Sequence, residues 1–302
     1  MAARADANRF RTGIAAMAAG CWFVSLSPVI VAGSDLHGVS MAFWRCWIGL
    51  AGVGTVALIR KSVTWAHIRQ TAPAALCFGS SIGLFFWASQ LTSIANASLI
   101  VVLQPIALMI GARYMFGESI TASDVFWTAV ALSGAAILVL AGNSGGTGDI
   151  RGDLLAGLSI VLGSGYFILG KRVLETVPVA TFMTGVFMWA GLLLAIAVAI
   201  SGQPVMPSTD GDWIRIVAIG LFPGTGHVLL NIAQNKAPLS LMGIGMLIVP
   251  VNATLLAYWF LDQSVTALQL VGMAMVITAL TIQTLLRRKL RARMDEQPVL
   301  DR

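Results

Sequence analysis

Charged side chains are scarce in this chain, since Asp, Glu, Lys and Arg make up 11% of its 302 residues. Soluble domains carry roughly 25% charged residues, whereas 57% of this chain is hydrophobic and its mean hydropathy is +0.84. This composition excludes a soluble domain and predicts an all-α protein embedded in a membrane.

Cysteine is also rare. Cys21, Cys46 and Cys77 all fall inside apolar stretches, and their spacing does not resemble that of metal ligands. We interpret them as small packing residues. The sequence therefore predicts no disulfide framework, no metal site and no cofactor.

Acidic residues are missing from the middle of every long apolar stretch, and no pair of basic residues lies there either. Buried carboxylates are a common device of proton-coupled pumps. Their absence argues against a drug–proton antiporter built on a buried acid. The absence of a deep basic pair argues against phosphate or nucleotide-sugar substrates.

Long apolar runs are abundant, and ten of them are long enough to cross a bilayer, which takes about 20 residues. The first follows three arginines, as a signal peptide does, but it is longer than a typical h-region of about 7–15 residues, and we expect it to be retained. The ten predicted spans are 12–31, 39–59, 72–91, 95–115, 125–141, 154–173, 179–200, 213–233, 239–261 and 265–286.

The second half of the chain repeats the first. Residues 95–127, moved forward by 145 positions, fall on 240–272 without a gap, so that Pro105 meets Pro250. Each copy holds five predicted spans, and an odd number inverts the second copy relative to the first. Inverted repeats place a binding site at their interface near the bilayer midplane, which favours transport.

Basic residues predict the topology. With a cytoplasmic N-terminus, 16 of the 19 Lys and Arg residues lie on the cytoplasmic side, and the outer side keeps Arg45, Arg151 and Arg215. This bias predicts that both termini are cytoplasmic, and it makes a nucleic-acid partner unnecessary. The expected organisation is a first repeat over 1–142, an outer linker over 143–153, a second repeat over 154–286 and a basic tail over 287–302.

A motif identifies a resemblance. The pattern P-x12-E-S-I-T, with Pro105, Glu118 and Thr121, resembles the EamA-type members of the drug/metabolite transporter superfamily. The second copy keeps Pro250 and Thr266.

Two positions depart from this pattern. The acidic position of the second copy is Gln263, preceded by Asp262, and the first copy has Trp127 where the second has Gly272. The motif therefore identifies the superfamily better than it identifies a substrate.

The resemblance implies a secondary transporter, not an enzyme, and is strongest to bacterial amino acid exporters, among them exporters of aromatic amino acids. We expect a monomer that spans the inner membrane and moves a small molecule by alternating access. Three rival hypotheses are an exporter of lipophilic cations or drugs, an antiporter for phosphorylated metabolites, and a membrane-embedded enzyme. The enzyme hypothesis lacks a convergent catalytic constellation in the sequence.

The most polar span is 213–233. Pro223 and Gly224 predict a break in its helix, and His227, Asn231 and Gln234 follow on one face at i, i+4 and i+7. Histidine has an unperturbed pKa of about 6.5, so His227 is a candidate for binding a carboxylate or carrying a proton. The alternative is a kinked helix whose polar groups satisfy one another.

Other spans offer partners for this face. Small polar and aromatic residues in them line the predicted cavity, with packing as the alternative for each residue. These candidates are Trp22, Ser80, Trp87, Gln90, Ser164, Tyr166 and Asn252.

Matched prolines predict mobile elements. Pro105 and Pro250 are expected to kink their spans and act as hinges, together with Pro223 and Gly224, although static kinks are the alternative. Arg45 is expected to extend to the outer surface and pair with an acid, or else to attract an anionic substrate. Glu118 and Arg113 are expected to form a gate or a helix-end contact.

Overall fold

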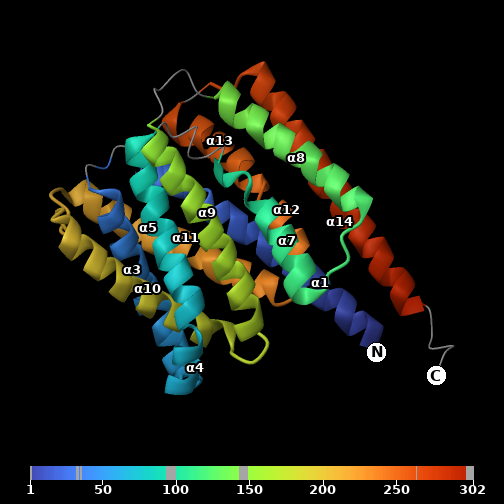
Figure 1. Ribbon diagram of the computed structural model, residues 1–302, viewed down its shortest axis with the longest axis horizontal. Helices are drawn as coiled ribbons and strands as arrows, with labels where there is room; N and C mark the ends of the chain where they lie inside the picture. Colours follow the sequence, from blue (N-terminus) through green and yellow to red (C-terminus); the bar gives the residue numbers. More distant parts are fainter. Residues whose placement is uncertain are drawn as a thin grey trace.

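A computed structural model of the chain describes residues 2–31, 34, 36–92, 100–142, 149–262 and 264–296, and every regular element in these ranges is an α-helix (Figure 1). Each of the ten apolar stretches is helical over most of its described residues. The helices are α1 (Ala2–Val24), α2 (Ser27–Val31), α3 (Gly38–Ile59), α4 (Trp65–Gln70), α5 (Ala72–Leu91), α7 (Gln104–Phe116), α8 (Ala122–Ala141), α9 (Ile150–Val173), α10 (Val179–Ser201), α11 (Asp210–Gln234), α12 (Leu239–Gly245), α13 (Ile248–Leu261) and α14 (Ala267–Glu296).

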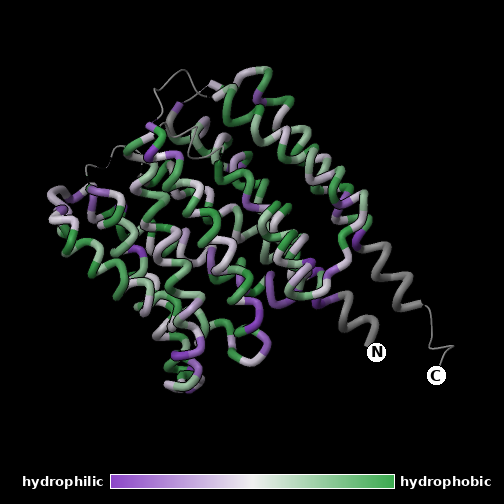
Figure 2. Tube along the Cα trace, viewed as in Figure 1, coloured by the Kyte–Doolittle hydropathy of each residue, from purple (hydrophilic) through white to green (hydrophobic). Residues whose placement is uncertain are grey.

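The outer surface of the bundle is apolar. Large side chains such as Phe126, Leu154 and Ile214 are more than half exposed there. Figure 2 shows hydrophilic segments mainly near the ends of the helices. Within the described residues, seven helical segments are long and apolar enough to cross a membrane, and Ala72–Ala88 is a shorter apolar helix. The chain is therefore a multi-pass membrane protein.

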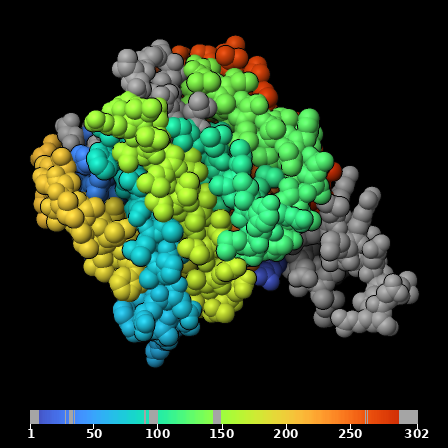
Figure 3. Space-filling view, in the orientation of Figure 1, coloured from blue at the N-terminus to red at the C-terminus, as the bar shows by residue number. Residues whose placement is uncertain are grey.

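The closest helix pairs join the two halves of the chain. Helix α5 packs against α9, α1 against α11, α3 against α10, and α8 against α14 (Figure 1). Figure 3 shows α5 between α9 and α10 on one face of the molecule. Because each pair takes one helix from each half, the halves interlock and share a common interior.

Glycines allow two of these pairs to approach closely. A Cβ atom added to Gly20 of α1 would lie 2.9 Å from the carbonyl oxygen of Gly226 in α11, and the reverse substitution would meet Gly20 at the same distance. Gly134 of α8 likewise lies against Gly272 of α14, where a Cβ atom would meet the carbonyl oxygen at 2.8 Å. Small residues let helix backbones pack against each other in a membrane.

The two spans that carry the matched prolines Pro105 and Pro250 are broken rather than kinked. A turn at 102–103 precedes α7, and a turn at 246–247 separates α12 from α13, so Pro105 and Pro250 lie in the first turns of new helices. Proline suits that place because the first turn needs no backbone donor. The expected break at Pro223 is wrong, because α11 runs continuously through that residue.

Candidate functional site

A cavity of about 270 Å³ lies in the interior that the two halves share. It is lined by residues of α1, α2, α3, α5, α7, α9, α11 and α13, and by residues of both helix breaks. Its lining includes Ser27, Arg45, Phe78, Ser81, Phe85, Phe86, Gln104, Pro105, Ser159, Tyr166, Phe167, His227, Met246 and Pro250.

Unpaired polar atoms point to a ligand in this cavity. Among the described residues, no partner lies within hydrogen-bonding distance of Nε and Nη2 of Arg45, Oγ of Ser27 or Nδ1 of His227, and all four atoms are buried. An uncompensated buried charge is costly. The cavity therefore presents a cation and two further polar groups that an anionic ligand would satisfy.

The position of Arg45 differs from the first expectation, which placed its side chain at the outer surface in a pair with an acid. Its side chain is 4% exposed and faces the cavity instead of extending to the surface. No carboxylate of the described residues forms an ion pair with it. The expected pairing with an acid is therefore wrong for this part of the chain.

Aromatic rings form one wall of the cavity. The ring of Phe78 lies 4.8 Å from that of Tyr166 and 5.0 Å from the imidazole of His227. Phe85 and Phe86 lie 6.0 Å apart. Aromatic rings pack well against other rings in tilted and edge-on arrangements, so this wall suits a flat apolar group.

The helix breaks add backbone carbonyl groups. In the first break, Leu103 donates to the carbonyl of Ile100, and in the second, Leu247 donates to that of Ile244, so both follow the tighter i to i−3 pattern. Pro105 has no N–H to give the carbonyl of Val101, a residue that lines the cavity. Polar backbone thus lies at the middle of the molecule, where transporters with broken helices bind solutes.

Two residues expected beside His227 pack elsewhere. The Nδ2 group of Asn231 donates to the hydroxyl of Tyr166 at 2.5 Å and to the carbonyl of His227 at 2.7 Å. The Nε2 group of Gln234 donates to the carbonyl of Phe167 at 3.1 Å. Both side chains are buried between α11 and α9, outside the cavity lining.

Most of the other candidates also lie outside the lining. Trp22 and Trp87 are more than a third exposed, and Trp22 contacts Trp259 on the outer face. Ser164 is buried without a described partner, and Asn252 is buried next to residues of the cavity.

Ser80 precedes the cavity residue Ser81 and does not line the cavity itself, and Gly224 faces a lateral groove of the bundle. The side chain of Gln90 and the linker residues 143–148 are outside the described residues. Of the predicted binding residues, the structure brings His227 and Tyr166 together in the cavity, alongside the prolines Pro105 and Pro250.

A charged network joins helices at the end of the bundle that contains the first turns of α1, hereafter the terminus end. Glu118, in the loop after α7, accepts hydrogen bonds from the N–H groups of Leu239 and Ser240 at 2.7 and 3.1 Å. It also pairs with Lys171 of α9 at 3.0 Å. This is a helix-end contact, because the carboxylate caps the first turn of α12.

The charge of Glu118 is favoured by its surroundings. Burial by itself would raise the pKa of Glu118, but Lys171 and the hydrogen bonds from Ser240 and Leu239 outweigh burial and hold the pKa below its usual value. The carboxylate is therefore charged at neutral pH.

The network continues to the last helix. Arg287 of α14 pairs with Asp124 of α8 at 2.7 Å and reaches the hydroxyl of Ser240 at 3.4 Å. Ser240 in turn donates to Glu118 at 2.7 Å. Helices α8, α9, α12 and α14 are thus tied together on one side of the cavity.

The sequence did not indicate the phenylalanines of α5 that line the cavity, and the position first expected for Arg45, at the outer surface, is wrong. A signal for Arg45 was available, because it is the one cation in the interior of a predicted span. Phe78, Phe85 and Phe86 had no such signal, since phenylalanine is equally suited to lipid-facing and cavity-facing positions.

Comparison with known proteins places the chain among transporters. Residues 11–140 and 150–285 each match the EamA-like transporter family. The chain is 24% identical over 246 residues to the aromatic amino acid exporter YddG of Ancylobacter novellus, covering 78% of this chain and 84% of the relative.

A second relative and a solved structure are also similar to this chain. The probable terminal-alkyne amino-acid exporter of Streptantibioticus cattleyicolor is 25% identical over 287 residues, covering 88% of this chain and 92% of the relative. A crystal structure titled only as that of a protein superposes with a TM-score of 0.79 at 21% identity, covering 94% of this chain and 99% of the other, which shows the shared fold. The two family matches span most of the chain, and it belongs to the EamA-like transporter family, whose members are transporters and not enzymes.

Proposed function

We propose that this transporter exports amino acids, aromatic ones included, by secondary transport through the central cavity. The observation that carries the proposal is Arg45, a buried cation that lines the cavity without an ion-pair partner among the described residues. An amino acid supplies the missing anion as its α-carboxylate.

The carboxylate binds to the guanidinium group of Arg45, with the hydroxyl of Ser27 as a second donor. Hydrogen bonds between a guanidinium and a carboxylate are among the strongest in proteins and fix the orientation of the ligand. His227 lies in the same cavity and binds the other polar end of the zwitterion together with the carbonyl group freed by Pro105.

The side chain of the substrate packs against Phe78, Tyr166 and the neighbouring rings of the aromatic wall. Both relatives carry the names of amino acid exporters, one of them as a probable exporter, and the name of the other specifies aromatic substrates. Asn231 and Gln234 act through α9 in this proposal: Asn231 holds the Tyr166 hydroxyl, and Gln234 ties α11 to the backbone of Phe167.

The membrane arrangement follows the sequence repeats. We place ten spans in two inverted halves, 1–142 and 154–286, joined by an outer linker over 143–153, with both termini and the basic tail 287–302 in the cytoplasm. The protein lies in the bacterial inner membrane as a monomer. The cavity alternates between the two sides by movement at the breaks before Pro105 and Pro250, while the Glu118 network closes the terminus end.

The cation in the cavity also separates this function from its rivals. A lipophilic cation would be repelled by Arg45 in a medium of low dielectric constant. A phosphorylated metabolite carries about two negative charges, whereas Arg45 is the one Lys or Arg among the described residues of the lining.

Transport by purified protein in liposomes tests the proposal. Vesicles preloaded with unlabelled phenylalanine should accumulate labelled phenylalanine by exchange. Excess phenylalanine, which has both the carboxylate and the ring, should compete better than alanine, which lacks the ring. Phenylethylamine lacks the carboxylate and should compete poorly. Movement of a cationic dye without movement of any amino acid would overturn the proposal.

A further inference from the structure

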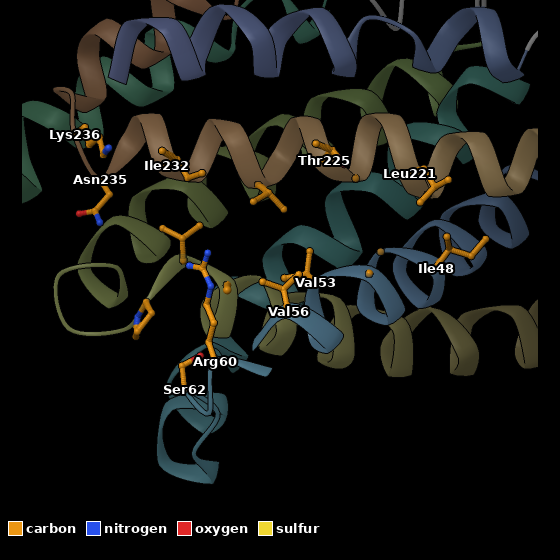
Figure 4. Close-up of a pocket in the computed structure, with 18 residues that line it drawn as sticks. Ile48, Val53, Val56, Arg60, Ser62, Leu221, Thr225, Ile232, Asn235 and Lys236 are labelled. Atoms are coloured by element: carbon orange, nitrogen blue, oxygen red, sulfur yellow. The ribbon is translucent and has the colours of Figure 1, made fainter. Parts of the chain in front are cut away.

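A lateral groove of about 820 Å³ lies on the outer face of the bundle, separate from the central cavity (Figure 4). Helices α3 and α11 form its two sides, and the first residues of α10 lie at its base. None of its lining residues lines the cavity, so it is a second hollow. Its volume lies within the range of small-molecule sites, roughly 300–1,000 Å³.

Small residues create the space between the two helices. A Cβ atom added to Gly52 of α3 would meet nothing within 4 Å, and one added to Gly224 of α11 would meet only the backbone of Gly49, at 3.9 Å. Val56 and Leu221 on the rims are 44% and 50% exposed. The groove is therefore accessible from the hydrocarbon region of the membrane.

The polarity of the groove changes along its length. Figure 4 shows Ile48 and Leu221 at one end, with Arg60, Ser62, Asn235 and Lys236 gathered toward the other. Among the described residues, no Asp or Glu lines the groove and no carboxylate pairs with Arg60 or Lys236. In this part of the chain, two cations without a counter-ion thus lie at the end of an apolar groove.

The position of the cations matches a membrane surface. Arg60 follows the last residue of α3, and Lys236 follows α11, whose end contacts Arg9 of α1 through the carbonyl of Asn235 at 2.9 Å. The charged end therefore lies at the terminus end of the bundle. From Ile48 to Arg60, α3 covers about 18 Å at a rise of 1.5 Å per residue, slightly more than half of a hydrocarbon core of about 30 Å.

We propose that the groove between α3 and α11 binds one phospholipid with an anionic headgroup, from the leaflet at the terminus end. The phosphate and headgroup lie at Arg60 and Lys236, with Ser62 and Asn235 as hydrogen-bonding neighbours, and an acyl chain lies along Gly52 and Gly224. Anionic lipids are attracted to basic residues next to the membrane. The lipid fills the gap between α3 and α11, the helices that carry Arg45 and His227, and it does so whichever solute the cavity carries.

Native mass spectrometry of the full chain, titrated in detergent with phosphatidylglycerol or phosphatidylcholine, tests this site. The wild type should retain one phosphatidylglycerol at about tenfold lower lipid concentration than phosphatidylcholine. The double variant Arg60→Gln/Lys236→Gln should lose most of this preference. The double variant Arg69→Gln/Arg113→Gln removes the same charge outside the groove and should keep it.

A second variant fills the groove without touching its charges. Gly52→Leu should lower the retention of both lipids, because its side chain enters space that no other atom occupies. Gly157→Leu is the matched control on α9, since a Cβ atom there also meets nothing within 4 Å.

Three results would overturn the proposal. The first is equal retention of the two lipids by the wild type, and the second is an unchanged lipid preference in the Arg60→Gln/Lys236→Gln variant. The third is a Gly52→Leu variant that lowers the fraction of dimer but leaves the retention of lipid unchanged. The last result would assign the groove to a second copy of the chain.

Discussion

The two halves of this transporter supply matching helices but different chemistry to the cavity. The position of α5 that matches His227 of α11 is Gly83, as the alignment of Gln90 with Gln234 shows. Helix α3 carries Arg45, whereas its partner α10 has no charged residue. The breaks before Pro105 and Pro250 are present in both halves. The repeated features are therefore those of the scaffold, and the unrepeated features include the residues that we propose to bind the solute.

The same contrast separates the two ends of the bundle. Asp124 caps the start of α8 and pairs with Arg287, whereas the matching residue at the start of α14 is the neutral Gln269, which caps its helix through Thr266. A repeated cap thus carries a charge at the terminus end only. In the proposed alternating mechanism, one state is preferred only if the two closures differ, and this difference in charge would supply that preference.

The largest effect is expected at Arg45. Arg45→Gln should lower the ratio of turnover to KM for amino acid exchange about 10- to 150-fold, because hydrogen bonds to a charged group contribute about 1.5–3 kcal/mol. Exchange assays in liposomes measure this. Arg215→Gln is the control, since that arginine pairs with Asp212 outside the cavity and its side chain is 35% exposed. An unchanged KM would remove Arg45 from binding.

A substitution at Glu118 tests the difference in charge between the two ends of the bundle. Glu118→Gln should lower the free energy of unfolding by about 1–3 kcal/mol, since the carboxylate loses its charge toward Lys171 and the first turn of α12. The folded pKa of Glu118 is depressed, so its contribution is complete at neutral pH and is lost as pH falls below the usual pKa of about 4.3.

Denaturation at pH 7 and pH 4 measures this contribution. The difference between wild type and variant should shrink at the lower pH and stay constant from pH 6 to 8. Glu175→Gln, at an exposed position, should change stability little at either pH. A difference that grows on acidification would contradict the assignment.

A smaller effect is expected at His227, whose matching residue in the first half is Gly83. His227→Gln should raise KM for amino acids about two- to tenfold, because a neutral hydrogen bond contributes about 0.5–1.5 kcal/mol. Exchange assays on this variant are compared with His67→Gln, which alters a histidine of α4 outside the cavity. Equal KM values for the two variants would argue that His227 serves packing alone.

The smallest effect is expected at the matched prolines. Pro105→Ala or Pro250→Ala should slow turnover about two- to fivefold with little change in KM, because a restored N–H allows an i to i−4 bond across each break. Single-turnover and steady-state exchange separate these quantities. A change in KM without a change in turnover would assign the prolines to binding. Pro207→Ala, in a loop, is the control.

Much of the helical framework could be predicted because apolar length is a local property. The stretches 39–59, 72–91 and 179–200 differ from α3, α5 and α10 by a residue or less at each end. The break expected at Pro223 failed for a local reason as well. One missing N–H does not interrupt a helix whose neighbouring bonds remain, whereas at Pro105 and Pro250 the chain had already begun a new helix.

The cavity was less predictable, because a helix surrounded by lipid and protein is apolar on every face. His227, Asn231 and Gln234 do share one face of α11, but Asn231 and Gln234 form hydrogen bonds with residues of α9. The Nδ2 group of Asn231 pairs with Tyr166, which lies 65 positions away in the chain, so no local pattern could indicate that this donor already had a partner.

By itself, the sequence determines that the chain lies in a membrane, that it is built from a repeat, and that its family is one of transporters. These properties follow from apolar length, from residue-by-residue correspondence and from a motif. The tertiary structure alone decides which polar groups remain unpaired: Asn231 finds Tyr166, Glu118 finds Lys171 and α12, and Arg45 finds no carboxylate among the described residues. Pairing depends on distances between helices far apart in the chain, so a local pattern of residues does not reveal which buried groups stay without a partner.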